Sequence, residues 1–430
     1  MARRFGRASA GWSGGRVVRR ALLVVAAAAL PTAGTLALAE DVDTSRPAMI
    51  VVGEPRGFAA SDRLDGQRRG MSRSPLPEAP KELWRRHISG GIDASPLVDA
   101  QGNVVVTLTV PEVVKLGADG KEVWRVRIGS NAPLAPAVLT SDGTLVLVTS
   151  AGVAWGLGPA GTTQFTTTLG VRGRDADVTP LALDDGAVVI AAGRSLVEIS
   201  GGGGVRARAE VGERVVGAVL RGPEGSLVTT ESGEVLAWHP PGAPRRVGSF
   251  GGAPRRGAVL ADARTLLAVV DGRRLMGLDL RTGLASTRAS GASGMGAFDA
   301  PPAVGAKGVA VTGTAAGVLV GVDAAGGESL RVAVDRAPPV SIPPDAGAGA
   351  ATLGLLGVLQ DVKPSPPVVL DGEGRVAFAR AGGRAGVVQP DGSLALATER
   401  VCASPVAVLP GGARRMLVAC RDGTLVMLGD

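Results

Sequence analysis

The chain has 430 residues, and its composition is typical of an all-β protein. Gly (65 residues) and Pro (29 residues) separate short apolar runs of Val, Leu and Ala, as expected for strands joined by turns. The net charge of +7 arises mainly in residues 1–39, which hold six arginines and no acidic residue; 40 basic and 39 acidic side chains remain. Because this balance leaves no sequence-wide positive charge to neutralise phosphates, we expect no nucleic-acid partner.

Residues 1–39 have the organisation of a secretory signal peptide. A basic start ends at Arg19-Arg20, an apolar stretch follows, and small residues ending in Ala39 precede Glu40. We expect cleavage after Ala39 and a periplasmic or secreted protein. The alternative is an uncleaved segment that anchors the chain, since roughly 18 apolar residues can just span a bilayer.

The next segment, residues 40–80, combines charged residues, Pro, Ser and Gly without hydrophobic periodicity. This composition is typical of a flexible linker. We therefore expect the folded domain to comprise residues 81–430.

One phrase recurs eight times from Ala94 onward. Each copy has a small residue or Pro, a short apolar run, a turn with Asp or Gly, and a β-branched run; the marker residues are Pro96, Pro136, Pro180, Gly217, Gly257, Pro301, Pro366 and Pro405. The intervals between markers are 40, 44, 37, 40, 44, 65 and 39 residues. A period near 40 residues with four short strands is typical of a propeller blade. The sequence thus predicts an eight-bladed β-propeller of four-stranded antiparallel blades.

The last copy lacks a fourth strand, because the chain ends after the strand that begins at Thr424. Residues 81–88, KELWRRHI, resemble residues 121–128, KEVWRVRI, which form the predicted fourth strand of the first blade. We predict that residues 81–88 complete the last blade and close the ring, which removes the exposed sheet edge of an open array.

The 65-residue interval is longer than the others and contains an expected inserted loop, residues 337–363. An insertion on one face of a repeat array is a candidate binding element. The alternative is a surface loop without a partner, since added loop length has little effect on stability.

The phrases ASPLVDAQGNVVV, from Ala94, and LGADGKEVW, from Leu116, resemble the PQQ-type repeat of the quinoprotein alcohol dehydrogenase-like β-propeller superfamily. The resemblance extends over residues 81–430. It implies either a dehydrogenase that carries pyrroloquinoline quinone (PQQ) and calcium, or a non-catalytic scaffold as in BamB-like members. The enzymes have a vicinal Cys-Cys pair that this sequence lacks, so the resemblance is closer to the non-catalytic members.

The two cysteines, Cys402 and Cys420, flank the Gly411-Gly412 turn, which is their midpoint. We expect them to face each other across two antiparallel strands and to form a disulfide, because an exported protein folds in an oxidising compartment. A pair of buried free thiols is the alternative.

Four tryptophans lie in predicted strands. Trp84 and Trp124 occupy matching positions in fourth strands, and we expect both to pack between blades. Trp155 and Trp238 lie in third strands, where packing between sheets is expected and stacking on a sugar or quinone is the alternative.

The spacing of the polar residues assembles no catalytic or metal-binding set. Asp-Gly pairs lie between consecutive strands, where they predict hairpin turns rather than calcium loops. His87 and His239 are far apart in the blade order. We therefore name no catalytic, cofactor-binding or metal residue and expect no cofactor; PQQ and calcium belong to the dehydrogenase alternative.

The sequence as a whole predicts a non-catalytic binding scaffold in the bacterial cell envelope. We expect a monomer that holds an envelope or outer-membrane protein on the loops of one propeller face, with membrane contact only through an uncleaved amino-terminal segment. The alternatives are a module that binds glycans or envelope polymers, and a PQQ-dependent dehydrogenase.

Overall fold

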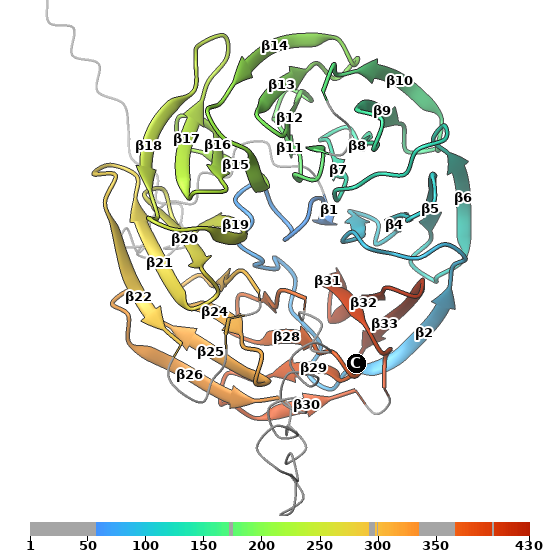
Figure 1. Ribbon diagram of the computed structural model, residues 1–430. Coiled ribbons are helices and arrows are strands. Elements are labelled where there is room, and N and C mark those ends of the chain that lie inside the picture. Colours follow the sequence, from blue (N-terminus) through green and yellow to red (C-terminus); the bar gives the residue numbers. More distant parts are fainter. Residues whose placement is uncertain (1–56, 172–174, 292–296, 299, 335–365, 398–399) are drawn as a thin grey trace, which may run out of the picture. The chain divides into compact units, whose positions relative to one another are not determined.

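The computed structural model describes residues 57–430 except 172–174, 292–296, 299, 335–365 and 398–399. The described strands form eight antiparallel sheets, and no helix occurs among the described residues. Figure 1 shows the sheets arranged as blades around an axis. The predicted eight-bladed all-β propeller is confirmed. The predicted signal peptide, residues 40–56 of the predicted linker and the predicted insertion over 337–363 lie outside the described residues.

The first four blades follow one another in sequence, and each runs from an inner first strand to an outer fourth strand. Their strands are β3 (Leu97–Asp99), β4 (Val104–Thr107), β5 (Glu112–Leu116) and β6 (Glu122–Arg127) in blade 1; β7 (Val138–Leu139), β8 (Leu145–Val148), β9 (Val153–Leu157) and β10 (Thr163–Thr168) in blade 2; β11 (Leu181–Ala182), β12 (Val188–Ala192), β13 (Ser195–Ile199) and β14 (Val205–Glu210) in blade 3; and β15 (Val215–Gly222), β16 (Gly225–Thr230), β17 (Glu234–Trp238) and β18 (Arg245–Ser249) in blade 4.

Blades 5 to 8 repeat this arrangement. Their strands are β19 (Pro254–Leu260), β20 (Thr265–Val270), β21 (Arg274–Asp279) and β22 (Ala285–Ser290) in blade 5; β23 (Ala303–Val304), β24 (Ala310–Gly313), β25 (Val318–Val322) and β26 (Glu328–Ala333) in blade 6; β27 (Val369–Leu370), β28 (Val376–Ala379), β29 (Ala385–Val388) and β30 (Leu394–Leu396) in blade 7; and β31 (Pro405–Gly412), β32 (Arg415–Cys420), β33 (Thr424–Gly429) and β2 (Lys81–His87) in blade 8.

The ring closes through β2, as predicted. β2 pairs antiparallel with β33, from Lys81 opposite Gly429 to His87 opposite Thr424. The last blade is therefore built from both ends of the folded chain, and its outer strand precedes blade 1 in the sequence.

Burial explains why the strands differ in composition. The second strands are buried on both faces between neighbouring blades, so they form continuous apolar runs such as Leu145–Val148. Outer strands such as β6 alternate between exposed and half-buried residues, because one side faces solvent. The core thus lies between blades; for example, Val113 of blade 1 packs in one cluster with Leu147 of blade 2.

The ring has two faces that differ in the loops they carry. We call the side with the turns between first and second strands, and between third and fourth strands, the turn face. The opposite side carries the turns between second and third strands and the links from blade to blade, and we call it the connection face. The predicted insertion interrupts the link between β26 and β27, so Val334 before it and Pro366 after it belong to the connection face.

Candidate functional site

Residues 57–80, which we call the axial segment, lie inside the ring against the first strands (Figure 1). β1 (Gly57–Ala59) pairs with β3 and adds an inner strand to blade 1. Gly57 lies opposite Asp99, which ends β3 at the turn face. We expected a flexible linker over residues 40–80; the described part of that range is instead held inside the ring.

The axial segment meets the blades in the order in which they follow one another. Its carbonyl groups accept hydrogen bonds from N–H groups of blades 2, 4, 5, 6, 7 and 8, at or just after the end of each first strand. The donor and acceptor pairs are Leu139–Ala60 (2.8 Å), Arg221–Gly66 (2.7 Å), Leu260–Gln67 (2.9 Å), Val304–Arg69 (2.8 Å), Leu370–Gly70 (2.9 Å) and Arg414–Pro75 (2.8 Å). Because a first strand presents an unpaired edge to the axis, these contacts satisfy backbone groups that the sheets leave open.

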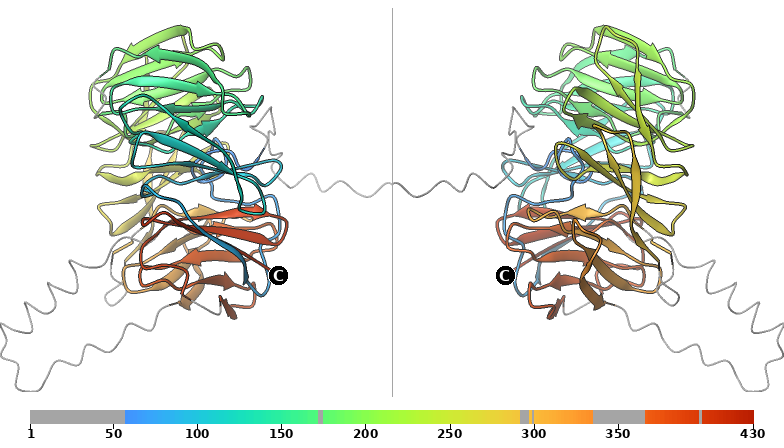
Figure 2. Two further views of the ribbon diagram at one scale, coloured as in Figure 1. Left: turned by 90° about the vertical axis from the view of Figure 1, so that its right-hand side faces the viewer. Right: turned by 90° about the vertical axis from the view of Figure 1, so that its left-hand side faces the viewer.

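In the side views of Figure 2 the axial segment lies toward the same side of the ring as the carboxyl terminus. This is the turn face, since the acceptors listed above meet each blade where its first strand ends in a turn. The axial segment therefore covers the centre of the turn face.

Arg68 connects the axial segment to blades 3 and 4. Its Nη1 atom donates to the carbonyl oxygen of Asp62 at 2.7 Å, and Nη2 donates to the carbonyl oxygens of Pro180 at 2.5 Å and Val219 at 3.4 Å. The side chain is buried, and desolvation lowers the pKa of Arg68. Several carbonyl dipoles thus surround this buried cation.

Arg63 is buried on the axis with fewer partners. Its Nη2 atom donates to the carbonyl oxygen of Pro302 in the link before β23, while Nε and Nη1 have no hydrogen-bond partner. Desolvation lowers the pKa of Arg63 to about 10, although the charges of Asp62 and Asp65 act in the opposite direction. The guanidinium remains protonated at neutral pH, and two of its nitrogens, Nε and Nη1, have no hydrogen-bond partner.

The backbone that carries these arginines is strained. Arg63, Leu64 and Arg68 have φ values of 59°, 79° and 60°, in the left-handed region that residues with a Cβ seldom adopt. Such residues persist only where surrounding contacts determine the conformation, and they cluster at functional sites. The contacts of the axial segment with the blades supply that constraint.

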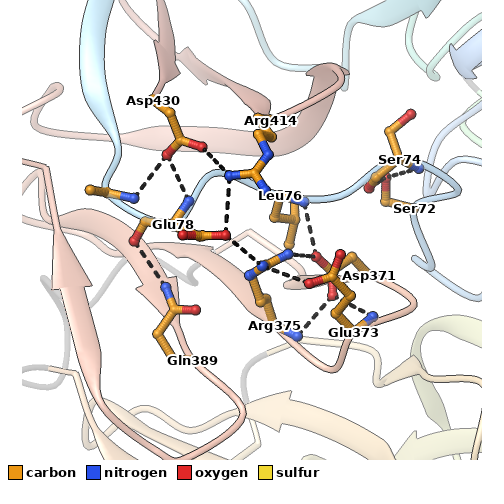
Figure 3. Close-up of polar contacts among 11 residues, drawn as sticks. Ser72, Ser74, Leu76, Glu78, Asp371, Glu373, Arg375, Gln389, Arg414 and Asp430 are labelled. Atoms are coloured by element: carbon orange, nitrogen blue, oxygen red, sulfur yellow. Dashed lines mark hydrogen bonds and ion pairs between the residues drawn. The ribbon is translucent and has the colours of Figure 1, made fainter.

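A cluster of ion pairs and hydrogen bonds holds the end of the axial segment on blades 7 and 8 (Figure 3). We call this cluster the latch; its charged residues are Glu78, Asp371, Arg375, Arg414 and Asp430. The backbone N–H of Leu76 donates to Asp371 at 2.9 Å, and Asp371 pairs with Arg375 at 3.1 Å. Arg375 also contacts Glu78 at 3.1 Å. Because the Asp371 side chain is fully buried, the loss of Arg375 would remove the cation that the structure pairs with it.

The second half of the latch joins both ends of the folded chain. Arg414 contacts Glu78 at 3.1 Å and Asp430 at 3.2 Å. The carboxylate of Asp430 accepts hydrogen bonds from the backbone N–H groups of Glu78 at 2.8 Å and Ala79 at 3.0 Å. The last residue of the chain thus fixes the residues that lead into β2 (Figure 3).

A small pocket lies between the axial segment and blades 7, 8 and 1. Asp62, Arg63 and Gly70 line it from the axial segment, and its cavity has a volume of about 20 Å³. The blade residues that line it include Ser95, Pro367 and Val406, which are half-buried and precede or begin first strands, and the buried Val369 and Leu409 farther along these strands. The pocket therefore opens toward the connection face.

The predicted packing residues lie between blades. Trp84 of β2 lies against Gly120 of blade 1, where an added Cβ would come within 2.9 Å of the indole, and Trp124 lies against Gly161 of blade 2 in the same way, at 3.0 Å. The indole nitrogens donate to the carbonyl oxygens of Ala118 and Pro159, each at 3.0 Å. Each tryptophan thus contacts the next blade at a turn.

Cys402 and Cys420 form a disulfide, with their Cα atoms 6.2 Å apart. The position of Cys402 differs from the expected cross-strand pair. It precedes β31 in the link from blade 7, and Pro405 is the residue opposite Cys420 in the sheet. The bond therefore ties the link between two blades to β32.

The structure gives Trp155 and Trp238 packing positions. Trp238 is fully buried, and its indole nitrogen donates to the carbonyl oxygen of Gly242 at 2.9 Å. Trp155 is half-buried in the cluster between blades 1 and 2. Trp238 is thus closed to a sugar or quinone ring, so the alternative of stacking is wrong for Trp238.

A groove of about 680 Å³ lies between blades 4 and 5, lined by β18, by β21 and by the turn that leads into β22. Gly248 of β18 lies at the position that Trp84 and Trp124 occupy in their blades, directly after a bulge in the fourth strand. An added Cβ on Gly248 would meet the carbonyl oxygen of Gly283 at 2.8 Å. At this groove the backbone of Gly248 therefore contacts the next blade, where other blades use a tryptophan side chain.

The Asp-Gly pairs of the repeats lie in turns, and most of their carboxylates accept a backbone N–H two residues ahead. The acceptors are Asp119, Asp142, Asp185, Asp371, Asp391 and Asp422. Across residues 57–430, outside the gaps given above, no group of three or more His, Cys, Asp or Glu side chains could hold a metal ion. No helix of that part of the chain is long and apolar enough to cross a membrane.

No protein-family model matches the chain, and no curated protein matches it. Among solved structures it is similar to the computationally designed Ika8 protein, with a TM-score of 0.58 and 12% identity over 82% of this chain and 99% of that one. It is also similar to BamB from Moraxella catarrhalis (TM-score 0.40, 15% identity, 84% and 97% of the chains) and to virginiamycin B lyase from Staphylococcus aureus (0.49, 10%, 81% and 98%). At these identities the similarity shows the propeller fold alone.

Proposed function

We propose that this protein is a non-catalytic binding scaffold of the bacterial cell envelope that holds a protein partner on its connection face. The choice of the connection face rests on the position of the axial segment. Its hydrogen bonds to six blades, at or just after the end of each first strand, cover the centre of the turn face with the protein's own chain. A partner that approaches the axis therefore does so from the connection face.

The direction of the chain supports the same choice. Gly57, the first described residue, lies at the turn face, opposite Asp99. The links flanking the predicted insertion, and the exposed side chains of Val110 and Leu134, belong to the connection face.

Two features support an envelope location. The predicted signal peptide directs export, and the Cys402–Cys420 disulfide is of a kind that persists in oxidising compartments. We further propose a periplasmic or secreted monomer that acts without a cofactor. The resemblance of the repeats to the PQQ-type repeat supports a BamB-like scaffold, and PQQ with calcium belongs to the dehydrogenase alternative.

The test is crosslinking in the native cell envelope, followed by purification of the protein and mass spectrometry of what is attached. The proposal predicts one recurrent envelope or outer-membrane protein, with crosslinks to residues of the connection face. A protein that is recovered only as an uncrosslinked monomer contradicts a protein scaffold, and glycan and quinone binding assays would then be the next measurements.

A further inference from the structure

The groove between blades 4 and 5, which we call the rim groove, lies where β18 and β22 form the outside of the ring (Figure 1). The fourth strands of blades 8, 1 and 2 fill such a junction with an aromatic ring: Trp84, Trp124 and Phe165 each lie against a glycine of the next blade. β18 has no aromatic residue and ends in Gly248 and Ser249. Short side chains on this strand therefore leave the rim groove open.

The rim groove has an apolar floor and an apolar edge. The buried side chains of Phe250 and Met276 line it, together with the half-buried Val247. Leu284, in the turn before β22, also lines the groove and is 72% exposed, more than any other large apolar side chain of the described residues. An apolar groove with an exposed leucine at its edge is typical of a surface that binds a partner.

Positive charge surrounds the rim groove. Among the described residues that line it are Arg246 and Arg274 and no acidic side chain. Residues 245–285, which supply the whole lining, hold eight arginines and three aspartates, whereas residues 40–430 hold 40 basic and 39 acidic side chains. The positive charge of the chain is thus concentrated around this groove, which favours an anionic ligand.

The two lining arginines remain accessible to a ligand. Arg246 pairs with Glu234 and Arg274 pairs with Asp271, each at 3.0 Å, and all four side chains are more than a third exposed. Exposed ion pairs contribute little free energy, because water and salt screen them. A guanidinium has five N–H donors, so each arginine can bind a further carboxylate without losing its first partner.

We propose that the rim groove binds an extended, acidic segment of a partner protein, in which apolar side chains alternate with carboxylates. Six consecutive residues, 246–251, line one side of the groove, a length of about 20 Å for an extended chain. β18 is also the edge strand of its sheet. An extended peptide can align along such an edge and place alternate side chains on the apolar floor.

The rim groove is separate from the connection face, so this inference goes beyond the proposed function and does not rest on it. An anionic polymer is the other class of ligand that the charge would attract. Such a polymer would use the arginines but not the apolar floor, and the experiment separates the two by the apolar side chains of the probe.

The experiment measures the binding of labelled synthetic peptides to the purified protein by fluorescence anisotropy. The probe alternates glutamate and valine over about seven residues, enough to span the groove. One comparison peptide has serine in place of valine, and another has lysine in place of glutamate. We expect saturable binding of the glutamate–valine probe that weakens as salt is added, about tenfold lower affinity for the serine peptide, and no saturable binding of the lysine peptide.

The arginines are tested by the double variant Arg246→Gln/Arg274→Gln. We expect it to bind the probe about tenfold or more weakly, because it removes two charge-assisted contacts. The matched control is Arg206→Gln/Arg331→Gln, which removes two exposed, ion-paired arginines from β14 and β26 and leaves the affinity unchanged. Circular dichroism checks that both variants are folded.

The apolar edge is tested by Leu284→Ser, which leaves the charge unchanged. We expect it to lower the affinity for the probe about threefold, because it removes an exposed apolar contact. Val123→Ser, at an exposed position on β6, is the matched control and should bind the probe as the wild type does.

A wild type that does not bind the glutamate–valine probe, or an arginine variant that binds it as tightly as its control, would overturn the proposal. Equal affinity for the serine peptide would also overturn it and assign the groove to an anionic polymer. These results are distinct from the crosslinking test of the proposed function, because that test concerns the connection face.

Discussion

The indole nitrogen of Trp84 donates a hydrogen bond of 3.0 Å to the carbonyl oxygen of Ala118, across the junction between the last blade and the first. Trp124 makes the equivalent bond from blade 1 to blade 2, whereas the strand that carries Trp84 also pairs with β33 from the other end of the folded chain. The Trp84 ring also covers Gly120, where it leaves no room for a Cβ. The closing strand β2 is thus held on one side by its backbone pairing with β33 and on the other by the contact of Trp84 with blade 1.

We expect Trp84→Ala to lower the free energy of unfolding by about 2–4 kcal/mol, because it opens a cavity between blades and leaves a carbonyl unpaired. Trp84→Phe keeps most of the contact and should lower it by about 1 kcal/mol. Urea unfolding measures both. Val123→Ala, at a 59% exposed site on β6, is the control and should change the value by less than about 0.5 kcal/mol. Equal effects of Trp84→Ala and the control would disprove the closing role.

The two buried arginines should respond differently to substitution by methionine. Arg68→Met leaves the carbonyl oxygens of Asp62, Pro180 and Val219 without their donor, and we expect a loss of about 3 kcal/mol or more. Arg63→Met removes one donated hydrogen bond and an incompletely paired buried cation, so the change should stay below about 1 kcal/mol. Thermal and urea unfolding of both variants test this order. A larger loss for Arg63→Met would show that Arg63 is chiefly structural.

The disulfide should stabilise the junction of blades 7 and 8. The cysteines are 18 residues apart, and a loop of that size predicts about 3 kcal/mol of stabilisation. The Cys402→Ala/Cys420→Ala double variant and the reduced wild type should therefore unfold at similar, lower urea concentrations. If a reductant lowers the urea midpoint of the double variant as much as that of the wild type, the loss of stability on reduction does not arise from this disulfide.

The latch should weaken in acid. Burial raises the pKa of Asp430, but hydrogen bonds from the backbone of Ala79, from Arg414 and from the backbone of Glu78 outweigh it and lower the pKa below its usual value. A carboxylate with a lowered folded pKa adds stability that is present above the unfolded pKa, near 4, and is lost as pH falls through the folded value.

We therefore expect Asp430→Asn to lower the free energy of unfolding by about 0.5–1 kcal/mol at pH 7, since Arg414 is half-exposed. The difference from wild type should persist from pH 7 down to about pH 5 and shrink as the pH falls below the unfolded pKa, near 4. Urea unfolding across this range measures it. A difference that is independent of pH would assign the effect to the shape of the side chain rather than its charge.

The repeats were predictable because every blade packs against its neighbours through the same sequence pattern. A small residue or Pro at markers such as Pro96, an apolar run and an Asp-Gly turn recur, and ring closure follows from the likeness of residues 81–88 to 121–128. Trp84 and Trp124 were predictable as packing residues because they occupy matching positions in these two segments.

The axial segment was not predictable in this way, because its contacts are made by backbone and by charged residues. Arginines such as Arg63 and Arg68 gave it the composition of a linker, yet they are buried against carbonyl groups of the blades. The one available signal was physical: first strands of a ring leave an unpaired edge at the axis, and some segment must satisfy it. The position of Cys402 was missed because strand β31 begins at Pro405 rather than before the cysteine.

The central claim is that a protein partner binds the connection face while the axial segment covers the centre of the turn face. The most direct measurement places a photo-crosslinking amino acid at Leu134 on the connection face or at Lys121 on the turn face, both exposed, in the full-length protein in its native envelope. We predict that Leu134 captures one recurrent envelope protein, which excess purified propeller displaces, and that Lys121 does not. Equal capture from both positions, or capture from Lys121 alone, would contradict the account.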